Sequence, residues 1–410
     1  MITRLDAERL DAADPLASFR DRFVLPDGLV YLDGNSLGAL PKAAAARLAD
    51  VVAREWGEGL VRSWNDAGWI DLPRRVGDKV GRLVGAEPGE VVCADSTSVN
   101  VFKVLSAALA LRPERRTILS EEGNFPTDLY VSEGLARLLD RGHRVRLVPK
   151  DALRDALDGD VAVLLLTHVD YRTGERHDME ALTRAARDAG ALAIWDLAHS
   201  AGAMPVDLHA AGADFAVGCG YKYLCGGPGA PAFLWVPRRL QEAFVQPLSG
   251  WLGHAAPFAF ESTYRPAAGV ARFLCGTPPI LSMSALDAAL DVLLEADLGL
   301  VRGKSEALTS FFVEAVEGAC GGALRLVSPR ESPRRGSQVS FAHPDGYAVM
   351  QALIARGVVG DFRAPDVLRF GFAPLHVRFV DAFDAARALA DVLATRAHER
   401  PELRRRAAVT

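Results

Sequence analysis

The sequence predicts an α/β protein with a large, mainly parallel seven-stranded sheet and a smaller α+β unit. The middle of the chain alternates apolar, β-rich runs with helical patterns, which is typical of βαβ units. The length of 410 residues suits two or three core-bearing units. Half of the residues are hydrophobic and 24% are charged, as in a compact globular protein.

The large sheet is expected from seven short apolar runs, at residues 90–93, 117–119, 145–148, 161–166, 191–195, 215–217 and 231–236. Helical patterns lie between several of them, at residues 99–111, 127–140 and 179–189. Helices that connect parallel strands must cover both faces of the sheet.

The character of the chain changes after about Met283. The expected elements there are helices at 284–295 and 301–317, a strand at 338–342, a helix at 346–356, a strand at 368–371 and a helix at 380–393. The N-terminal strand 30–32 and helix 42–56 cannot form a core alone, so we expect them to pack against this unit. The predicted domains are residues 59–283 and a discontinuous domain of residues 1–58 and 284–410.

Composition and charge exclude several classes of partner. The net charge of -5 comes from 47 basic and 52 acidic residues, so nothing favours nucleic acid or an anionic membrane. The N-terminus has no signal-peptide pattern, and the apolar run 161–166 is too short to span a bilayer. Five scattered cysteines without a C-x-x-C pair indicate reduced thiols, and we expect a cytoplasmic protein.

Polar side chains follow several of the predicted strands. Together with the aromatic and proline residues beside them, they are Ser96, Thr97, Ser98, Asn124, Phe125, Pro126, Thr127, Asp128, Thr167, His168, Asp196, His199, Tyr221 and Lys222. Ligands of open parallel sheets bind at the carboxyl ends of strands, so these residues are expected to converge on one site.

This set matches what pyridoxal 5'-phosphate requires of a protein. Lys222 can form the Schiff base, and Asp196 can pair with the pyridinium nitrogen. Phe125 can stack on the ring. Hydroxyls at Thr97 and Ser98 open a helical pattern, where backbone N–H groups favour a phosphate.

Each residue also has an ordinary structural interpretation. Lys222 fits a surface loop, Asp196 fits a helix N-cap, and Phe125 fits the core. The hydroxyls at Thr97 and Ser98 fit plain N-capping, which is compatible with phosphate binding. Asp196 with His199 also suggests a metal site, but no third ligand has suitable spacing, and we expect no metal.

Seven segments decide between these interpretations because they occur together and in order. They are YLDGNSLGALP (31–41), RSWNDAGW (62–69), NFPTDLY (124–130), WDLAHSAGA (195–203), GYKYLCGGPG (220–229), SGWLGH (249–254) and CGTPP (275–279). This pattern resembles kynureninases of the bacterial, kynurenine-preferring type, which are fold-type-I pyridoxal-phosphate enzymes. The resemblance runs from about residue 14 to 395.

The resemblance implies a cofactor site around Lys222, the Schiff-base lysine, with Asp196 on the pyridine nitrogen. It places His199, Pro126, Thr127 and Asp128 around the ring and Thr167 near the ring hydroxyl. It assigns the phosphate contacts to Thr97, Ser98 and Tyr221. Trp251 and Thr277 would reach the phosphate from a second subunit, so a homodimer with shared active sites is implied.

The resemblance also implies how the substrate is bound. Arg369 would grip the α-carboxylate, although an exposed strand arginine is the alternative. Trp64 and Gly276 would line the aryl pocket. The sequence departs from the family pattern at Gly226 and at Cys225, where asparagine is expected, and this leaves the turn geometry open.

The implied reaction is hydrolysis of L-kynurenine to anthranilate and L-alanine, a step of tryptophan catabolism, with Lys222 and Tyr221 as acid–base groups. Because Gly276 offers no side chain to a ring hydroxyl, kynurenine is expected to be preferred over 3-hydroxykynurenine. The alternatives are a class V aminotransferase, a cysteine desulfurase, a non-catalytic pyridoxal-phosphate-binding protein and, more distantly, a zinc hydrolase.

Overall fold

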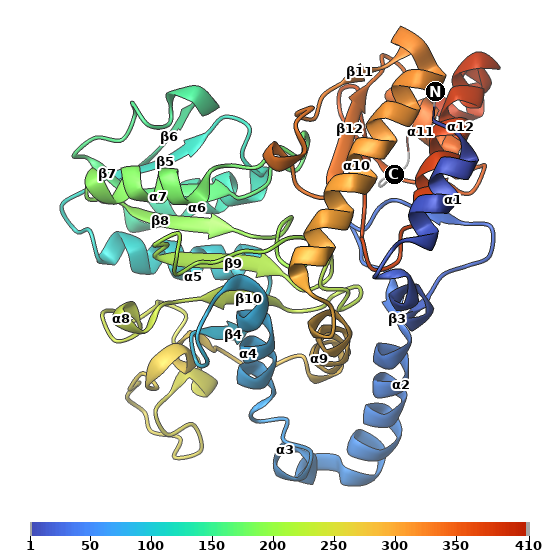
Figure 1. The fold of residues 1–410 in the computed structure, drawn as a ribbon. Helices are drawn as coiled ribbons and strands as arrows, with labels where there is room; N and C mark the ends of the chain where they lie inside the picture. Colours follow the sequence, from blue (N-terminus) through green and yellow to red (C-terminus); the bar gives the residue numbers. More distant parts are fainter. Residues whose placement is uncertain (1, 407–410) are drawn as a thin grey trace.

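The computed structural model describes residues 2–406, which fold around two sheets (Figure 1). The larger sheet has seven strands in the order β4-β10-β9-β8-β7-β5-β6. These strands are β4 (Val91–Cys93), β5 (Thr117–Glu121), β6 (Arg144–Val148), β7 (Val161–Thr167), β8 (Leu192–Asp196), β9 (Phe215–Cys219) and β10 (Ala232–Trp235). Only β10 is antiparallel to its neighbours, so the other six strands all end at one edge.

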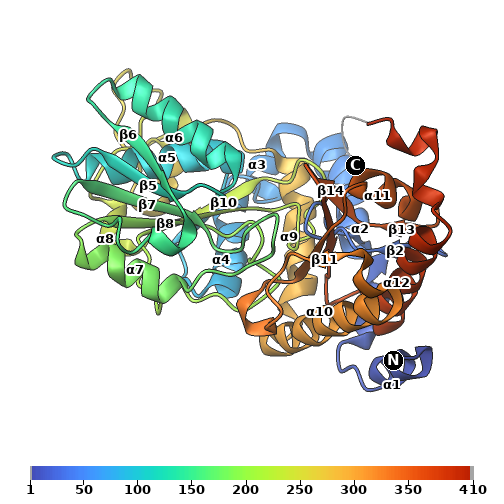
Figure 2. The same ribbon diagram turned by 90° about the horizontal axis from the view of Figure 1, so that it is seen from above.

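Helices cover both faces of this sheet (Figure 2). One face carries α5 (Thr97–Ala110) and α6 (Pro126–Leu139), and the other carries α4 (Leu72–Val84), α7 (Met179–Asp188) and α9 (Ile280–Leu294). Side chains alternate along the strands. Val163 and Leu165 of β7 therefore join the cluster under α5, whereas Leu164 and Leu166 join the cluster under α7.

The smaller sheet is antiparallel, in the order β11-β12-β15-β14. Its strands are β11 (Arg325–Leu326), β12 (Gln338–Ala342), β14 (Asp361–Arg363) and β15 (Val367–Gly371), and its helices are α10 (Leu298–Cys320), α11 (Gly346–Ile354) and α12 (Phe379–Ala394). The ring of Phe312 lies in the core of this unit, 4.9 Å from the Phe370 ring centroid and 5.2 Å from that of Phe372.

The N-terminal segment joins the smaller unit, as expected, and also reaches the larger one. Strand β2 (Val30–Tyr31) pairs in parallel with β13 (Val358–Val359), and α1 (Arg4–Ala12) packs on α12. A small sheet forms from β1 (Phe23–Val24) and β3 (Leu40–Pro41). Helix α2 (Lys42–Asp50) continues as a wider π-helical stretch, Val51–Gly59, and packs on α9. The short helices are α3 (Ser63–Asp66) and α8 (Arg238–Gln241).

All seven predicted strands of the large sheet are present, and the sheet is mainly parallel as predicted. Helix α4 and strand β14 were not predicted. Gly77 and Gly81 weaken the helical signal of α4. Gly77 is required by packing, because a Cβ there would lie 2.3 Å from the carbonyl oxygen of Val91 in β4. Among residues 2–406, no helix is both long and apolar enough to cross a membrane.

Candidate active site

Lys222 lies just after β9, at the edge where the parallel strands end. Its Nζ is 3.0 Å from Nε2 of His199, which follows β8. The same Nζ is 5.9 Å from the ring centroids of Phe125 and Tyr221. The neighbouring positions of β8 and β9 therefore bring together residues that the sequence predicted for one site.

The N-terminal segment covers the backbone of this turn. The Gly38 N–H donates to the carbonyl of Tyr221 over 2.8 Å. A Cβ on Gly38 would lie 2.3 Å from the carbonyl oxygen of Lys222, so only glycine allows this close approach. The loop before α2 thus fixes the position of the lysine.

Two buried carboxylates lie near Lys222. Asp196 is 3% exposed, and its Oδ1 accepts from the Ala198 N–H over 2.8 Å. Asp128, in the first turn of α6, is 1% exposed, and neither of its oxygens has a hydrogen-bond partner among the described residues. Burial raises the pKa of both groups; the charge of Lys222 opposes this, and the charge of Asp196 adds to it at Asp128. A second cation beside these acids would be strongly stabilised.

Several buried polar atoms around the lysine lack partners within residues 2–406. Besides the Asp128 oxygens, they are Thr167 Oγ1, His199 Nδ1 and Asn124 Nδ2. The other end of the Asn124 amide is held, since its Oδ1 accepts from the Thr167 N–H over 2.8 Å. Buried polar atoms are almost always paired in proteins, so this cluster is suited to a polar ligand.

The protonation state of His199 follows from its surroundings. Burial, and then the charge of Lys222, hold the pKa of His199 well below its usual range. The ammonium of Lys222 can only donate, so Nε2 of the neutral ring accepts and its proton resides on Nδ1. That N–H is buried and available to an acceptor on a ligand. Tyr221 keeps its proton as well, because burial raises its pKa.

The amino terminus of α5 supplies a candidate anion site. Ser96 caps this helix, and its Oγ accepts from the Val99 N–H over 3.4 Å. The half-buried hydroxyls of Thr97 and Ser98 in the first turn make no hydrogen bond within the described residues. Free N–H groups and hydroxyls at a helix amino terminus suit a phosphate. Pro126 and Thr127 begin α6, directly after Phe125.

Arg369 of β15 is 1% exposed and already has several partners. Its Nε donates to Asp361 over 2.6 Å, its Nη2 donates to Asp361 and Ser36, and its Nη1 donates to the Tyr171 carbonyl. The interpretation of Arg369 as an exposed strand arginine is therefore wrong. Much of its donor capacity is used within the protein.

A second arginine, Arg363, was missed in the sequence. It lies on β14, two residues from Asp361, and its Nη2 contacts the same carboxylate at 2.9 Å. Its side chain is 36% exposed, against 2% for Arg369. The charges of both arginines, after burial and the charge of Lys222, contribute to the lowered pKa of His199.

The neighbouring carboxylates do not fully balance the positive charge of these two arginines. Asp361 is shared between them, and the next acid is Asp33, which is half-buried with its Oδ1 enclosed. Burial and the charge of Asp361 raise the pKa of Asp33 to about 7. Burial and the charge of Arg369 lower the pKa of Arg363. An incoming anion would therefore be favoured here.

Four predicted site residues lie on the surface of the chain. Trp64 packs edge-on against Trp69 with centroids 5.8 Å apart, and Trp251 packs likewise against Phe258 at 5.7 Å. Gly276 and Thr277 are exposed, and a Cβ on Gly276 would meet nothing within 4 Å. No described contact joins these four residues to Lys222 in a single chain.

The turn after Lys222 contains Cys225, at the position where the family pattern has asparagine. Cys225 has φ +56°, in the left-handed region that asparagine tolerates better than most residues. We predict that C225N is more stable than C225A, by roughly 0.5 to 1 kcal/mol, since left-handed backbone costs about 1 to 2 kcal/mol for ordinary residues. Urea unfolding compares the two variants, and an equal or lower midpoint for C225N would contradict this account.

Within residues 2–406, no group of three His, Cys, Asp or Glu side chains is placed to hold a metal ion. Asp196 and His199 are instead the companions of Lys222.

Comparison with known proteins identifies the family. A family model described as the kynureninase C-terminal domain matches residues 301–389. A curated kynureninase of Burkholderia pseudomallei (strain 1106a) is 58% identical, with 100% of both chains covered. A curated kynureninase of Pseudomonas fluorescens is 56% identical over 96% of both chains.

Solved structures share the fold. A cysteine desulfurase from Thermococcus onnurineus NA1 superposes with a TM-score of 0.77 at 19% identity, covering 92% of this chain and 98% of that chain. A cysteine desulfurase from Escherichia coli has a TM-score of 0.77 at 21% identity, covering 93% and 98%. These matches confirm the predicted fold-type-I architecture. With more than half of all residues identical over the full length of curated relatives, the chain belongs to the kynureninase family.

Proposed function

We propose that this chain hydrolyses L-kynurenine to anthranilate and L-alanine, with pyridoxal 5'-phosphate held at Lys222. The observation that carries the proposal is the contact between Lys222 and His199, beside two buried carboxylates, in a member of the kynureninase family. One water is consumed: its oxygen enters the aryl carboxylate, one hydrogen completes the alanine methyl group, and the other leaves as a proton.

The unpaired atoms of the site fit the cofactor. Asp196 would hold the protonated ring nitrogen, a cation that offsets the cost of its burial. Phe125 would stack on the ring, and Thr97 and Ser98 would bind the phosphate with the amino terminus of α5. The free groups of Asp128, Thr167 and His199 would surround the ring, with Pro126 and Thr127 beside them. When bound, the cofactor withdraws electrons from the substrate carbons.

Lys222 and Tyr221 are the proposed acid–base groups. The lysine amine, once released by substrate, would remove the proton from Cα. Its neighbour His199 is neutral and offers Nε2 as an acceptor, which holds the amine in place. Tyr221 would donate rather than accept a proton near neutral pH, because burial raises its pKa.

The substrate carboxylate would bind between Arg369 and Arg363. Arg369 is anchored by Asp361 and the Tyr171 carbonyl, so its orientation is fixed. Arg363 is freer, and burial beside a second arginine leaves it in need of an anion. We therefore assign Arg363 a substrate-binding role together with Arg369.

We predict that R363Q raises KM for kynurenine by roughly tenfold or more, with a smaller change in kcat, because a charge-assisted hydrogen bond is lost. L-alanine and L-alaninamide, tested as inhibitors, separate the cause. Wild type should prefer alanine, and R363Q should lose that preference. R356Q removes an arginine that pairs with Asp391 on the smaller unit and serves as the control. An unchanged preference in R363Q would remove Arg363 from the carboxylate site.

A homodimer would complete the site with Trp251 and Thr277 from the second subunit. Large apolar side chains are exposed on the same segments as these two residues and Trp64: Trp56, Leu60, Val61, Phe258 and Phe260. Exposed apolar groups gathered in this way are typical of an interface. Trp64 and Gly276 would then line the aryl pocket, and because Gly276 has no side chain to bind a ring hydroxyl, kynurenine would be preferred over 3-hydroxykynurenine.

The remaining features stay predictions. They are the division into residues 59–283 and residues 1–58 with 284–410, a cytoplasmic location, and the absence of nucleic acid or membrane partners.

The test is the product balance of the purified protein loaded with cofactor. Anthranilate fluorescence and an alanine assay should rise together, one for one, from L-kynurenine, and kcat/KM should be lower for 3-hydroxykynurenine. Formation of a keto acid in place of alanine would indicate an aminotransferase, and no anthranilate at all would overturn the proposed function.

A further inference from the structure

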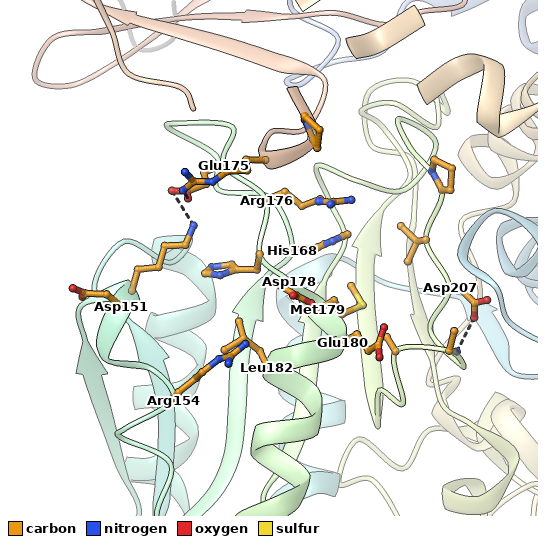
Figure 3. A pocket seen from close by; sticks show the side chains of 18 residues that line it. Asp151, Arg154, His168, Glu175, Arg176, Asp178, Met179, Glu180, Leu182 and Asp207 are labelled. Carbon is orange, nitrogen blue, oxygen red and sulfur yellow. Dashed lines mark hydrogen bonds and ion pairs between the residues drawn. The ribbon is translucent and has the colours of Figure 1, made fainter. Parts of the chain in front are cut away.

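A separate cavity of about 960 Å³ lies where α7 meets the segment that precedes β12 (Figure 3). His168 lines it from the end of β7, Met179 and Leu182 from α7, and Pro333 and Arg334 from the smaller unit. His168 follows Thr167, and successive residues of a strand point to opposite faces. The ring of His168 packs edge-on against Trp195, 6.1 Å away, whose side chain belongs to the cluster under α7. The cavity is therefore distinct from the Lys222 site.

Unpaired hydrogen-bond donors converge on this cavity. His168 is 5% exposed, and its Nδ1 is buried without a partner among residues 2–406. Burial, and then the charges of Arg176, His177 and Arg302, lower the pKa of His168 to about 3, so its ring is neutral. The guanidinium of Arg176 has no side-chain partner among the described residues, and Figure 3 shows it close to His168.

The acids of the cavity do not satisfy these donors, because nearly all of them have other partners. Glu175 is paired with Lys150 and Arg334, each at 2.8 Å. Asp178 accepts from the Ala181 N–H, Asp207 accepts from the Ala210 N–H, and Glu180 contacts Arg184. Asp151 is exposed, as is Arg154. The local deficit is therefore an acceptor beside Arg176 and His168.

We propose that this cavity binds an organic anion, a carboxylate or phosphate group carried on an apolar body. The anion would accept from Arg176 and from the His168 ring. Apolar side chains of Met179, Leu182 and Val206 line the remaining space, which is large enough for a small molecule and far too large for a bare ion. Such a ligand would contact both α7 of the larger unit and Pro333 of the smaller unit, and so would bridge the two units.

Fluorine NMR titration of the cofactor-loaded enzyme tests this site. The probes are 4-fluorobenzoate, 4-fluorophenyl phosphate and the uncharged 4-fluorobenzyl alcohol. R176Q should weaken binding of at least one anionic probe about tenfold or more. The uncharged alcohol should bind the wild-type enzyme no more tightly than it binds R176Q. R154Q, which removes an exposed arginine of the same cavity, should change the affinity less than about twofold.

The variant also separates this cavity from the active site. Any anion bound near Lys222 stays bound in R176Q, so only the component that disappears with Arg176 belongs to the cavity. Because the Arg176 side chain makes no hydrogen bond within the described residues, R176Q should unfold at the wild-type temperature. The relative affinities of the two anionic probes identify the head group. Binding that R176Q leaves unchanged, equal loss in R154Q, or no saturable binding of either anion would overturn the proposal.

Discussion

Replacing Lys222 with alanine is expected to lower kcat by roughly a thousandfold or more, because the Schiff-base amine and a proton carrier are removed together. The variant should still fold, since Lys222 is only partly buried and, among the described residues, its Nζ forms a hydrogen bond with one side chain, that of His199. Steady-state anthranilate release measures the rate. Absorbance of the loaded protein should show the loss of the Schiff-base band.

K42A is the matched control for this substitution. Lys42 is exposed at the start of α2, on the element that follows the loop covering the active-site turn. K42A should keep the band and the wild-type rate. A K222A enzyme with more than about a tenth of wild-type activity would contradict the assigned role, since positioned proton transfer alone contributes more than this.

Replacing Asp196 with asparagine is expected to lower kcat by roughly a hundredfold or more and to weaken cofactor retention. Asparagine has nearly the same shape, so it preserves the packing of a residue that is 3% exposed. It cannot supply the negative charge that would keep the ring nitrogen protonated. The expected result is therefore a folded protein that loses cofactor on dialysis faster than wild type.

Asp188 provides the control for this charge change, because it is exposed at the end of α7 and makes no ion pair within residues 2–406. D188N should retain both cofactor and rate. If D196N retained the cofactor as wild type does and also turned over kynurenine at the wild-type rate, the pairing of Asp196 with the ring nitrogen would be wrong. Rapid cofactor loss with unchanged kcat at saturating cofactor would restrict Asp196 to binding.

Much of the site could be predicted from sequence because its residues follow strands. Continuous apolar runs predicted β7, β8 and β9, and in a parallel sheet their ends must share one edge. This alone placed Asp196 and Lys222 close together. Their contact through His199, 23 residues before the lysine, depends on the pairing of β8 with β9, which single-strand patterns do not specify.

The arginine pair shows what local patterns could not predict. Strand β14 has three residues, too few for a periodic signal. Asp361 is opposite Arg369 in the antiparallel register, and Arg363 lies on the same face two residues later. The proposed role of Arg363 therefore depends on cross-strand pairing, and its only sequence signal is a charged cluster close to the predicted strand of Arg369.

His168 illustrates a second reason. Because His168 directly follows an apolar strand, the sequence predicted that it would converge on the Lys222 site, but this was wrong: its buried ring lines the separate cavity on the other face of the sheet. Only the three-dimensional arrangement shows that its Nδ1 is unpaired and that Arg176, from the following loop, lies near it. Gly77 of α4 is a similar case. A glycine is required there because α4 packs closely against β4, and this contact is visible only in the folded structure.

The most direct test of the central claim is to locate the cofactor on the chain. Borohydride reduction of the loaded protein, followed by proteolysis and mass spectrometry, should find the reduced pyridoxyl group on the peptide that contains Lys222. The best internal comparison is Lys103, which is fully buried in α5 and paired with Asp95. Label on Lys222 alone is the predicted result. Label on Lys103 or another lysine, or no stable label at all, would contradict this account.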